Sequence, residues 1–198
     1  MDDADRRDYF RIADHVLLDY RVVTARTADE GAAADFFPPC HAFDLMRQLR
    51  LLEQEYGASR PASDQARDHD PALRLLHRKV DLVAASLVAV TRKLQGEAQP
   101  LPVVLSEGGL AFPTDEPLAP GTLLALQIQL LPEWLGLHLH GEVIHDQPPR
   151  QLIQPEWERF DHQAAVHFIR LRESDRQLLA RHILKRQVEE RRQRQQED

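Results

Sequence analysis

The spacing of hydrophobic residues changes twice along this 198-residue chain, and this change limits the folds open to it. Residues 15–23 alternate apolar and polar side chains, which is the pattern of a half-buried β-strand. Residues 41–98 have a helical spacing instead, and the strand spacing returns after Pro100. A helix-spaced pattern cannot bury its apolar face as a strand. The sequence therefore predicts a β domain that a helical segment interrupts.

Six short segments carry the strand pattern, with glycine and proline residues in the stretches between them. They are residues 15–23, 103–105, 110–112, 123–130, 137–144 and 164–170. Short strands separated by such turn residues predict a small antiparallel barrel. In the first segment, Leu18, Tyr20 and Val22 alternate with polar residues, so we expect them to face the interior.

The last part of the chain has a helical pattern. Ser174–Gln177 fits a capping box, so we predict a helix that starts there and continues through Val188. The following residues, 189–198, are almost all charged or glutamine, and we expect this end to fray.

These patterns together predict an α+β protein. Residues 1–28 and 99–190 are assigned to a discontinuous barrel with its C-terminal helix. Residues 40–98 are assigned to an inserted two-helix, coiled-coil-forming segment, and residues 191–198 to a disordered tail.

The inserted segment contains an unbroken heptad seam, with apolar residues alternately three and four positions apart. Its members are Leu73, Leu76, Val80, Val83, Leu87, Val90 and Leu94. Leucine at the a positions with valine at two d positions favours three- or four-stranded assemblies, so the seam predicts an interface between copies of the chain. The preceding helix repeats the spacing at Ala42, Leu45, Leu49, Leu52 and Tyr56. An antiparallel hairpin within one chain is therefore the alternative.

Composition excludes several classes of protein. The net charge of -7 provides no general attraction for DNA or RNA. Cys40 is the only cysteine, which rules out internal disulfides and CxxC-type metal sites. No apolar run is long enough to span a bilayer, and the acidic start has the wrong polarity for a secretory signal. We therefore expect a cytoplasmic protein without membrane insertion.

Two polar fragments, almost a hundred residues apart, are the best candidates for a binding site. Arg7 and Arg11 lie four positions apart, and the planar fork of arginine matches phosphate oxygens or the O6/N7 edge of guanine. Downstream, Ser106 and Gly109 belong to a short turn between two strand segments, where a hydroxyl and bare backbone are available to a ligand. Either fragment alone also fits a solvated arm or an ordinary hairpin loop.

The sequence contains no positive sign of an enzyme and predicts no catalytic residue, metal or cofactor. His138, His140 and Glu142 alternate along one strand, which could be a metal-ligand spacing, but a solvated strand face is the favoured interpretation. A metal-dependent enzyme that uses these three residues is the distant alternative. No partner group orients the Cys40 thiol as a nucleophile.

In the order and spacing of its motifs, the chain resembles a PilZ domain, the bacterial receptor module for cyclic di-GMP. Arg7-Asp8-Tyr9-Phe10-Arg11 matches the RxxxR motif of that family, and Ser106 and Gly109 match the Ser and Gly of its [D/N]xSxxG motif. The resemblance covers roughly residues 5–24 and 100–188. It implies a PilZ-like barrel and makes cyclic di-GMP the candidate ligand of Arg7, Arg11, Ser106 and Gly109.

The chain departs from the family pattern in two places. Residues 25–99 separate the two motifs, and the resemblance is to an atypical branch that assembles as a tetramer through such a heptad-bearing insertion. Val104 takes the place of the Asp or Asn that, in the family, hydrogen-bonds the guanine base. Losing such a bond would cost on the order of 1–3 kcal/mol.

Two hypotheses about function follow from this resemblance. The first is a cyclic di-GMP receptor that also acts as an oligomeric adaptor. The second is a ligand-independent PilZ scaffold that docks an unknown protein partner.

Overall fold

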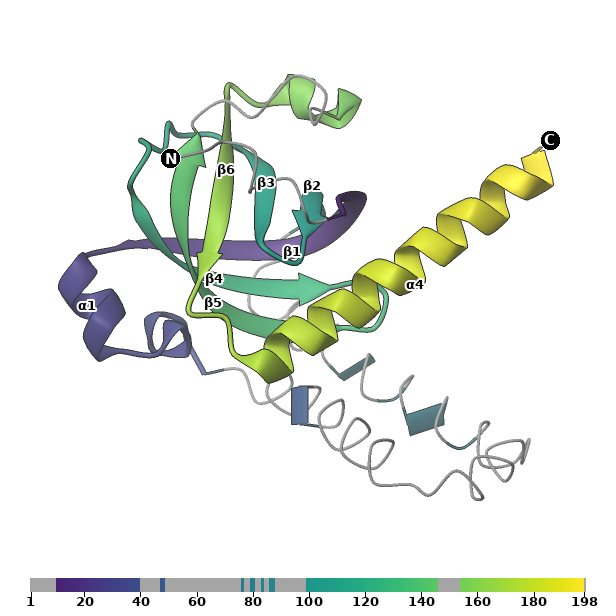
Figure 1. Cartoon of the computed structure of the whole chain (residues 1–198), viewed down its shortest axis with the longest axis horizontal. Coiled ribbons are helices and arrows are strands. Elements are labelled where there is room, and N and C mark those ends of the chain that lie inside the picture. The colour runs from purple at the N-terminus through teal and green to yellow at the C-terminus, as the bar shows by residue number, and fades with distance from the viewer. Residues whose placement is uncertain are drawn as a thin grey trace.

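The computed structural model describes residues 10–39, 47–48, 76, 79–80, 83, 86–87, 99–145 and 154–197. Within these residues, six antiparallel strands form a closed barrel in the order β1-β2-β3-β6-β5-β4 (Figure 1). The strands are β1 (Ile12–Val23), β2 (Leu101–Ser106), β3 (Gly109–Thr114), β4 (Leu123–Leu130), β5 (Leu135–His145) and β6 (His162–Ile169). The predicted α+β fold with a small antiparallel barrel is confirmed.

The alternation of side chains along each strand decides which residues fill the barrel. In β2, Val103 and Leu105 are fully buried in the main core, while Val104 between them belongs to a separate apolar cluster outside it. In β1, Tyr20 packs on Phe112 with the ring centroids 5.5 Å apart. Strand pairing thus separates an interior set of residues from an exterior set that needs another cover.

The expected inward orientation in β1 holds for two of the three residues. Leu18 and Tyr20 pack against the core. Val22 is 63% exposed, so the prediction was wrong for this residue. It precedes the last residue of β1, and alternation predicts which face a side chain takes but not how far along a strand the core reaches.

A short helical stretch follows β1. Thr24 caps the N-terminus of helix α1 (Ala25–Glu30), and its hydroxyl accepts a hydrogen bond from the Thr27 backbone N–H at 3.2 Å. The 3-10 helix η1 (Ala33–Phe36) comes next. Arg170, directly after β6, donates a hydrogen bond to the Ala28 carbonyl at 2.9 Å and forms an ion pair with Asp29. These contacts attach the stretch to the barrel.

The inserted segment can be followed at residues 47–48, 76, 79–80, 83 and 86–87, which are all helical. Arg47 forms a 2.6 Å ion pair with Asp175, which is 2% exposed. This contact ties the inserted segment to the first turn of the C-terminal helix.

The C-terminal helix α4 (Glu173–Glu197) packs its buried face on the barrel core, and its C-terminal half extends beyond the barrel (Figure 1). The helix begins at Glu173, one residue before the predicted cap, so Ser174 lies in the first turn rather than capping it. It also continues to Glu197, through the segment for which we expected fraying and a disordered tail. No helix among the described residues is long and apolar enough to cross a membrane.

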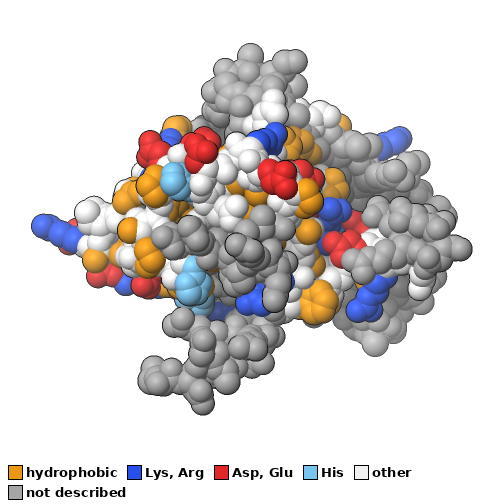
Figure 2. All heavy atoms as spheres, turned by 90° about the horizontal axis from the view of Figure 1, so that it is seen from above, with side chains coloured by type: hydrophobic (Ala, Val, Ile, Leu, Met, Phe, Trp, Pro, Cys, Tyr) orange, Lys and Arg blue, Asp and Glu red, His pale blue; other side chains and the backbone are white. Residues whose placement is uncertain are grey.

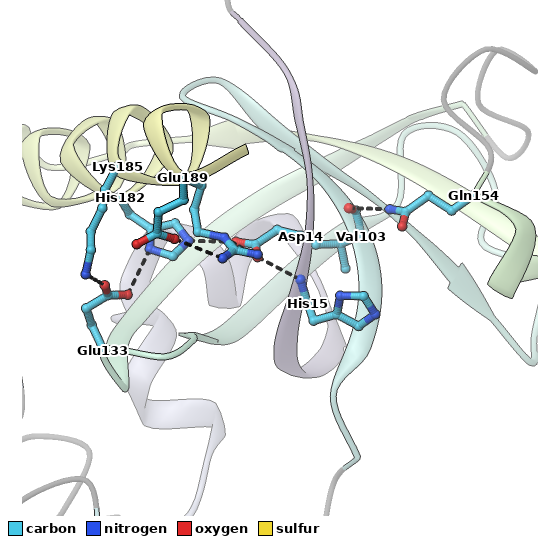
Figure 3. Close-up of polar contacts among 9 residues, drawn as sticks. Asp14, His15, Val103, Glu133, Gln154, His182, Lys185 and Glu189 are labelled. Carbon is cyan, nitrogen blue, oxygen red and sulfur yellow. Dashed lines mark hydrogen bonds and ion pairs between the residues drawn. The ribbon is translucent and has the colours of Figure 1, made fainter. Parts of the chain in front are cut away.

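A buried polar network joins α4 to β1 and to the β4–β5 turn (Figure 3). His182 Nε2 lies 2.6 Å from Asp14 Oδ2, and Arg186 Nε donates to Asp14 Oδ1 at 3.1 Å. On its other side, His182 Nδ1 lies 3.4 Å from Glu133 Oε2, and Glu133 also pairs with Lys185. Asp14 is 2% exposed and His182 5% exposed, so removing one charge would leave its partner buried and uncompensated.

The network shifts the pKa values of both titrating partners. Burial alone would lower the pKa of His182, but the hydrogen bond and charge of Asp14, together with Glu133, raise it overall. Burial likewise opposes ionisation of Glu133, but His182 and Lys185 outweigh it and lower its pKa to about 2. The His182–Glu133 contact does not satisfy hydrogen-bond geometry, so we treat it as an electrostatic attraction.

These shifts predict a pH-dependent stability that depends on His182. A raised histidine pKa stabilises the fold fully below the unfolded value of 6.5, and the contribution disappears as pH rises through the folded pKa. The lowered pKa of Glu133 stabilises the fold above pH 4.5, and this stabilisation is lost as the pH falls toward about 2.

The difference in unfolding free energy between wild type and His182→Gln should therefore be largest between pH 4.5 and pH 6.5, the unfolded-state pKa values of Glu133 and His182, and should shrink at alkaline pH. Urea unfolding measures this, with the exposed His145→Gln as control; a pH-independent difference would contradict the network.

Candidate ligand site

The β2–β3 turn and the start of β1 meet at one edge of the barrel. Ser106 pairs with Gly109, and the Ser106 hydroxyl donates to the Gly109 carbonyl at 3.2 Å. Ile12 pairs with Leu105, so continuing this register by one position places Arg11 beside Ser106. The register thus places three of the four predicted ligand residues next to one another along the backbone. The Arg11 side chain, however, lines a groove with residues of the C-terminal helix and not with the turn. The fourth residue, Arg7, lies outside the described residues.

Gly109 has a structural role of its own. A Cβ atom at this position would lie 2.4 Å from the Val166 carbonyl oxygen in the neighbouring strand β6. Gly109 pairs with His167 there, so any side chain would push β3 away from β6. The barrel therefore requires glycine at this position whether or not a ligand approaches, and the Ser106 hydroxyl is already used within the turn.

The outer face beside this turn is closed by a tryptophan. Val104 pairs with Ala111, and Ala111 pairs with Ala165, so three small side chains form a floor across β2, β3 and β6. Trp157 packs on this floor, is fully buried, and leaves Val104 only 8% exposed. Because Ser106 lies two residues after Val104 on the same face, the covered surface borders the candidate site.

The tryptophan is held by hydrogen bonds as well as by packing. It belongs to the 3-10 helix η4 (Pro155–Arg159) in the connection between β5 and β6. Its Nε1 donates to the Pro102 carbonyl at 2.7 Å. Beside it, Gln154 Nε2 donates to the Val103 carbonyl at 2.5 Å (Figure 3). A polar base-reading side chain at position 104 would therefore be buried against an indole ring. No periodic pattern surrounds Trp157, so the sequence alone did not indicate its role.

The histidines of β5 do not form a solvated strand face, so that interpretation was wrong. The ring of Phe37 stacks on His138 with centroids 5.8 Å apart, and Phe36 meets His140 edge-on at 6.1 Å. His140 is only 8% exposed, and burial, with a smaller effect of the Arg170 charge, lowers its pKa. Glu142 remains exposed. Among the described residues, no group of three histidine, cysteine or acidic side chains is arranged to hold a metal ion.

Four of the seven heptad-seam residues fall within the described part of the chain, and all four are exposed. The exposed fractions are 56% for Leu76, 46% for Val80, 71% for Val83 and 49% for Leu87. The remaining three, Leu73, Val90 and Leu94, lie outside the described residues. Large apolar side chains gathered on one helical seam mark a surface that another element can cover.

The tryptophan cover predicts graded losses of stability. Trp157→Ala should lower the unfolding free energy by about 3–5 kcal/mol, because it removes a fully buried aromatic ring. Trp157→Phe should lose less, mainly the hydrogen bond to Pro102, which contributes about 1 kcal/mol. Urea denaturation measures both; an unchanged midpoint for Trp157→Ala would show that this segment does not cover the face in solution.

Comparisons with known proteins agree with this architecture. The sequence model of the PilZ domain matches residues 77–185, more than half of the chain. No curated protein matches. A similar solved structure is a pathogenic protein from Xanthomonas campestris, described as a new tetrameric PilZ domain self-assembled via an unusual helical bundle. It is 20% identical, with 93% of this chain and 89% of that chain covered and a TM-score of 0.55, which shows a shared fold. The chain belongs to the PilZ domain family.

Proposed function

We propose that this protein is an oligomeric PilZ scaffold that docks partner proteins without binding cyclic di-GMP. PilZ is a family related to cyclic di-GMP signalling. The observation that carries the proposal is Val104 buried beneath Trp157 on the outer face of the barrel. We expect the scaffold to act in the cytoplasm.

The outer face that Trp157 covers supports a scaffold that does not bind the nucleotide. A bound guanine needs a polar partner and an open surface, and position 104 offers neither. Seating a base there would first require removing a fully buried indole ring from its apolar floor and breaking its hydrogen bond to Pro102. Ser106 and Gly109 do not argue against this, because the turn and the β3–β6 pairing explain both residues.

The exposed seam supports the oligomeric part of the proposal. Leu76, Val80, Val83 and Leu87 present apolar side chains at heptad spacing, which is the pattern that one helix uses to pack against another. We propose that copies of the chain cover the seams of one another as a tetramer. The tetrameric helical bundle of the Xanthomonas campestris protein is a precedent for this assembly.

A cyclic di-GMP receptor is the second candidate, and the position of Arg11 favours it. Arg11 lies beside Ser106 by strand register. A guanidinium group bonds phosphate oxygens bidentately, which suits a phosphate ligand at this place. A ligand held by Arg7, Arg11, Ser106 and Gly109 would still have to bind without a polar side chain at position 104.

Calorimetric titration with cyclic di-GMP separates the two candidates. We expect no heat of binding at high protein concentration, and the same result for an Arg7→Ala/Arg11→Ala variant. Heat that this double variant abolishes would establish the receptor instead. A Val104→Asn/Trp157→Ala variant restores the amide of the family motif and removes the cover, so it should gain affinity if the covered face is what prevents binding.

Substitutions at the seam test the assembly. Leu87→Glu should dissociate the oligomer, because it places a carboxylate in an apolar interface. Light scattering should then give the 22.8 kDa mass of a single chain. Val22→Glu is the matched control, since Val22 is also an exposed apolar residue, at 63% against 49% for Leu87, and lies on the barrel. A wild-type monomer at micromolar concentration would refute the proposed oligomer.

A further inference from the structure

Helix α4 has a second apolar face, on the side away from the barrel. Its first apolar face, with Leu178, Leu179 and Ile183, packs in the barrel core. Leu184 and Val188 lie four positions apart on the opposite side and are 61% and 47% exposed. Side chains at this spacing lie one above the other on a helix, so these two residues form a continuous apolar strip. The strip lies in the middle of α4, next to the half that extends beyond the barrel (Figure 1).

Basic residues border this apolar strip at both ends. Arg181, three positions before the strip, and Arg192, four positions after it, are exposed and share its side of the helix. Lys185 lies beside the strip and pairs with Glu133. The strip and its basic border span about three turns of helix. We call this surface the α4 docking face.

The acidic residues of the same stretch lie on other sides of the helix. Glu189 pairs with Arg186, whose guanidinium also bonds the buried Asp14. Glu190 lines the groove beside the start of β1. On the face drawn in Figure 2, in contrast, acidic and basic side chains lie close together. A basic border around an apolar strip is therefore a local feature of a chain whose net charge is -7.

The charge of the α4 docking face argues against a second copy of the chain as its occupant. A twofold interface joins the same surface of both copies, so it would place arginines opposite arginines. Like charges across an interface repel each other. Two exposed aliphatic side chains also provide little apolar area for a stable dimer, whose interface buries about 1,200–2,000 Å². The face suits a small element of opposite charge.

A lipid surface is a poorer match than a protein element. A helix that lies in a membrane interface buries a wide apolar face in the lipid. The wide apolar face of α4 is used on the barrel instead, where it belongs to the main core. The narrow strip of Leu184 and Val188 has the width that one helix presents to another.

We propose that the α4 docking face binds an acidic amphipathic helix of a partner protein. The apolar side of that helix packs on Leu184 and Val188, the way peptide helices dock on apolar grooves. Its flanking carboxylates lie opposite Arg181 and Arg192, whose guanidinium groups bond carboxylate oxygens bidentately. This inference rests on the proposed scaffold function and names the docking surface and the class of partner.

Fluorescence anisotropy of a labelled peptide, titrated with the full chain, tests the docking face. The probe is a peptide of about 18 residues, long enough to form a helix, with leucines at heptad spacing and glutamates beside them. A matched peptide carries lysines in place of the glutamates. The acidic peptide should bind, and the lysine peptide should bind at least about tenfold more weakly, because it faces like charges.

Substitutions in the apolar strip separate packing from charge. Leu184→Ser/Val188→Ser should weaken binding of the acidic peptide at least about tenfold, because it removes the apolar contact and leaves the arginines in place. Both residues are exposed, so the fold does not depend on them. Val22→Ser is the control for loss of an exposed apolar side chain elsewhere and should change the affinity by less than about twofold.

A charge reversal gives the second test. Arg181→Glu/Arg192→Glu should lose the acidic peptide and gain the lysine peptide, each by at least about tenfold. Arg26→Glu/Arg159→Glu is the matched control, because it makes the same change in net charge at exposed arginines of α1 and η4. It should leave both affinities within about twofold.

Several results would overturn the docking face. They are no binding of the acidic peptide, equal affinity for the two peptides, and equal losses in the two arginine variants. Binding to phosphatidylglycerol vesicles that only Leu184→Ser/Val188→Ser abolishes would assign the face to a membrane instead. A smaller oligomer mass for the same variant in light scattering would assign it to a second copy. The scaffold proposal would survive each of these results, because the cyclic di-GMP titration decides it.

Discussion

Closure of the barrel is the constraint on which the rest of the structure depends. In a closed sheet, alternate side chains point inward and fill the core, and the others point outward without a second sheet to cover them. Apolar residues on the outside must therefore be covered by segments from elsewhere in the chain. Two such segments do this in the described structure: η1 and the residue after it cover β4 and β5, and Trp157 covers β2, β3 and β6. The buried face of α4 instead joins the interior core.

The same constraint explains why one charged residue of β1 is tolerated in the barrel. Asp14 lies two residues from both Ile12 and Val16, so its side chain is on the same inner face of β1, and it is almost fully buried. Its carboxylate would be unstable there without compensation, and His182 and Arg186 of α4 supply it. The helix therefore contributes both apolar packing and the partners of a buried charge. One turn beyond these partners, residues of α4 line a groove together with Phe10 and Arg11.

The outer face shows how a family motif can persist for structural reasons. Ser106 closes the β2–β3 turn, and Gly109 allows β3 to approach β6, so both residues serve the barrel itself. Val104 completes an apolar floor for Trp157. A motif match at Ser106 and Gly109 therefore indicates the fold of the barrel and does not by itself indicate that a ligand binds. The proposed role as a scaffold rests on this distinction.

The sequence by itself determined the strand segments, the C-terminal helix and the inserted heptad seam, because hydrophobic periodicity is a local property that neighbouring residues display. It also placed Leu18 and Tyr20 on the inner face. The cover of Val104 by Trp157, some fifty positions away, was decided only by the tertiary structure. So were the pairing of Asp14 with His182, the exposure of Val22, and the groove between Arg11 and Arg191. These features depend on strand register and on how helices dock, which bring distant residues together and leave no periodic trace in the sequence.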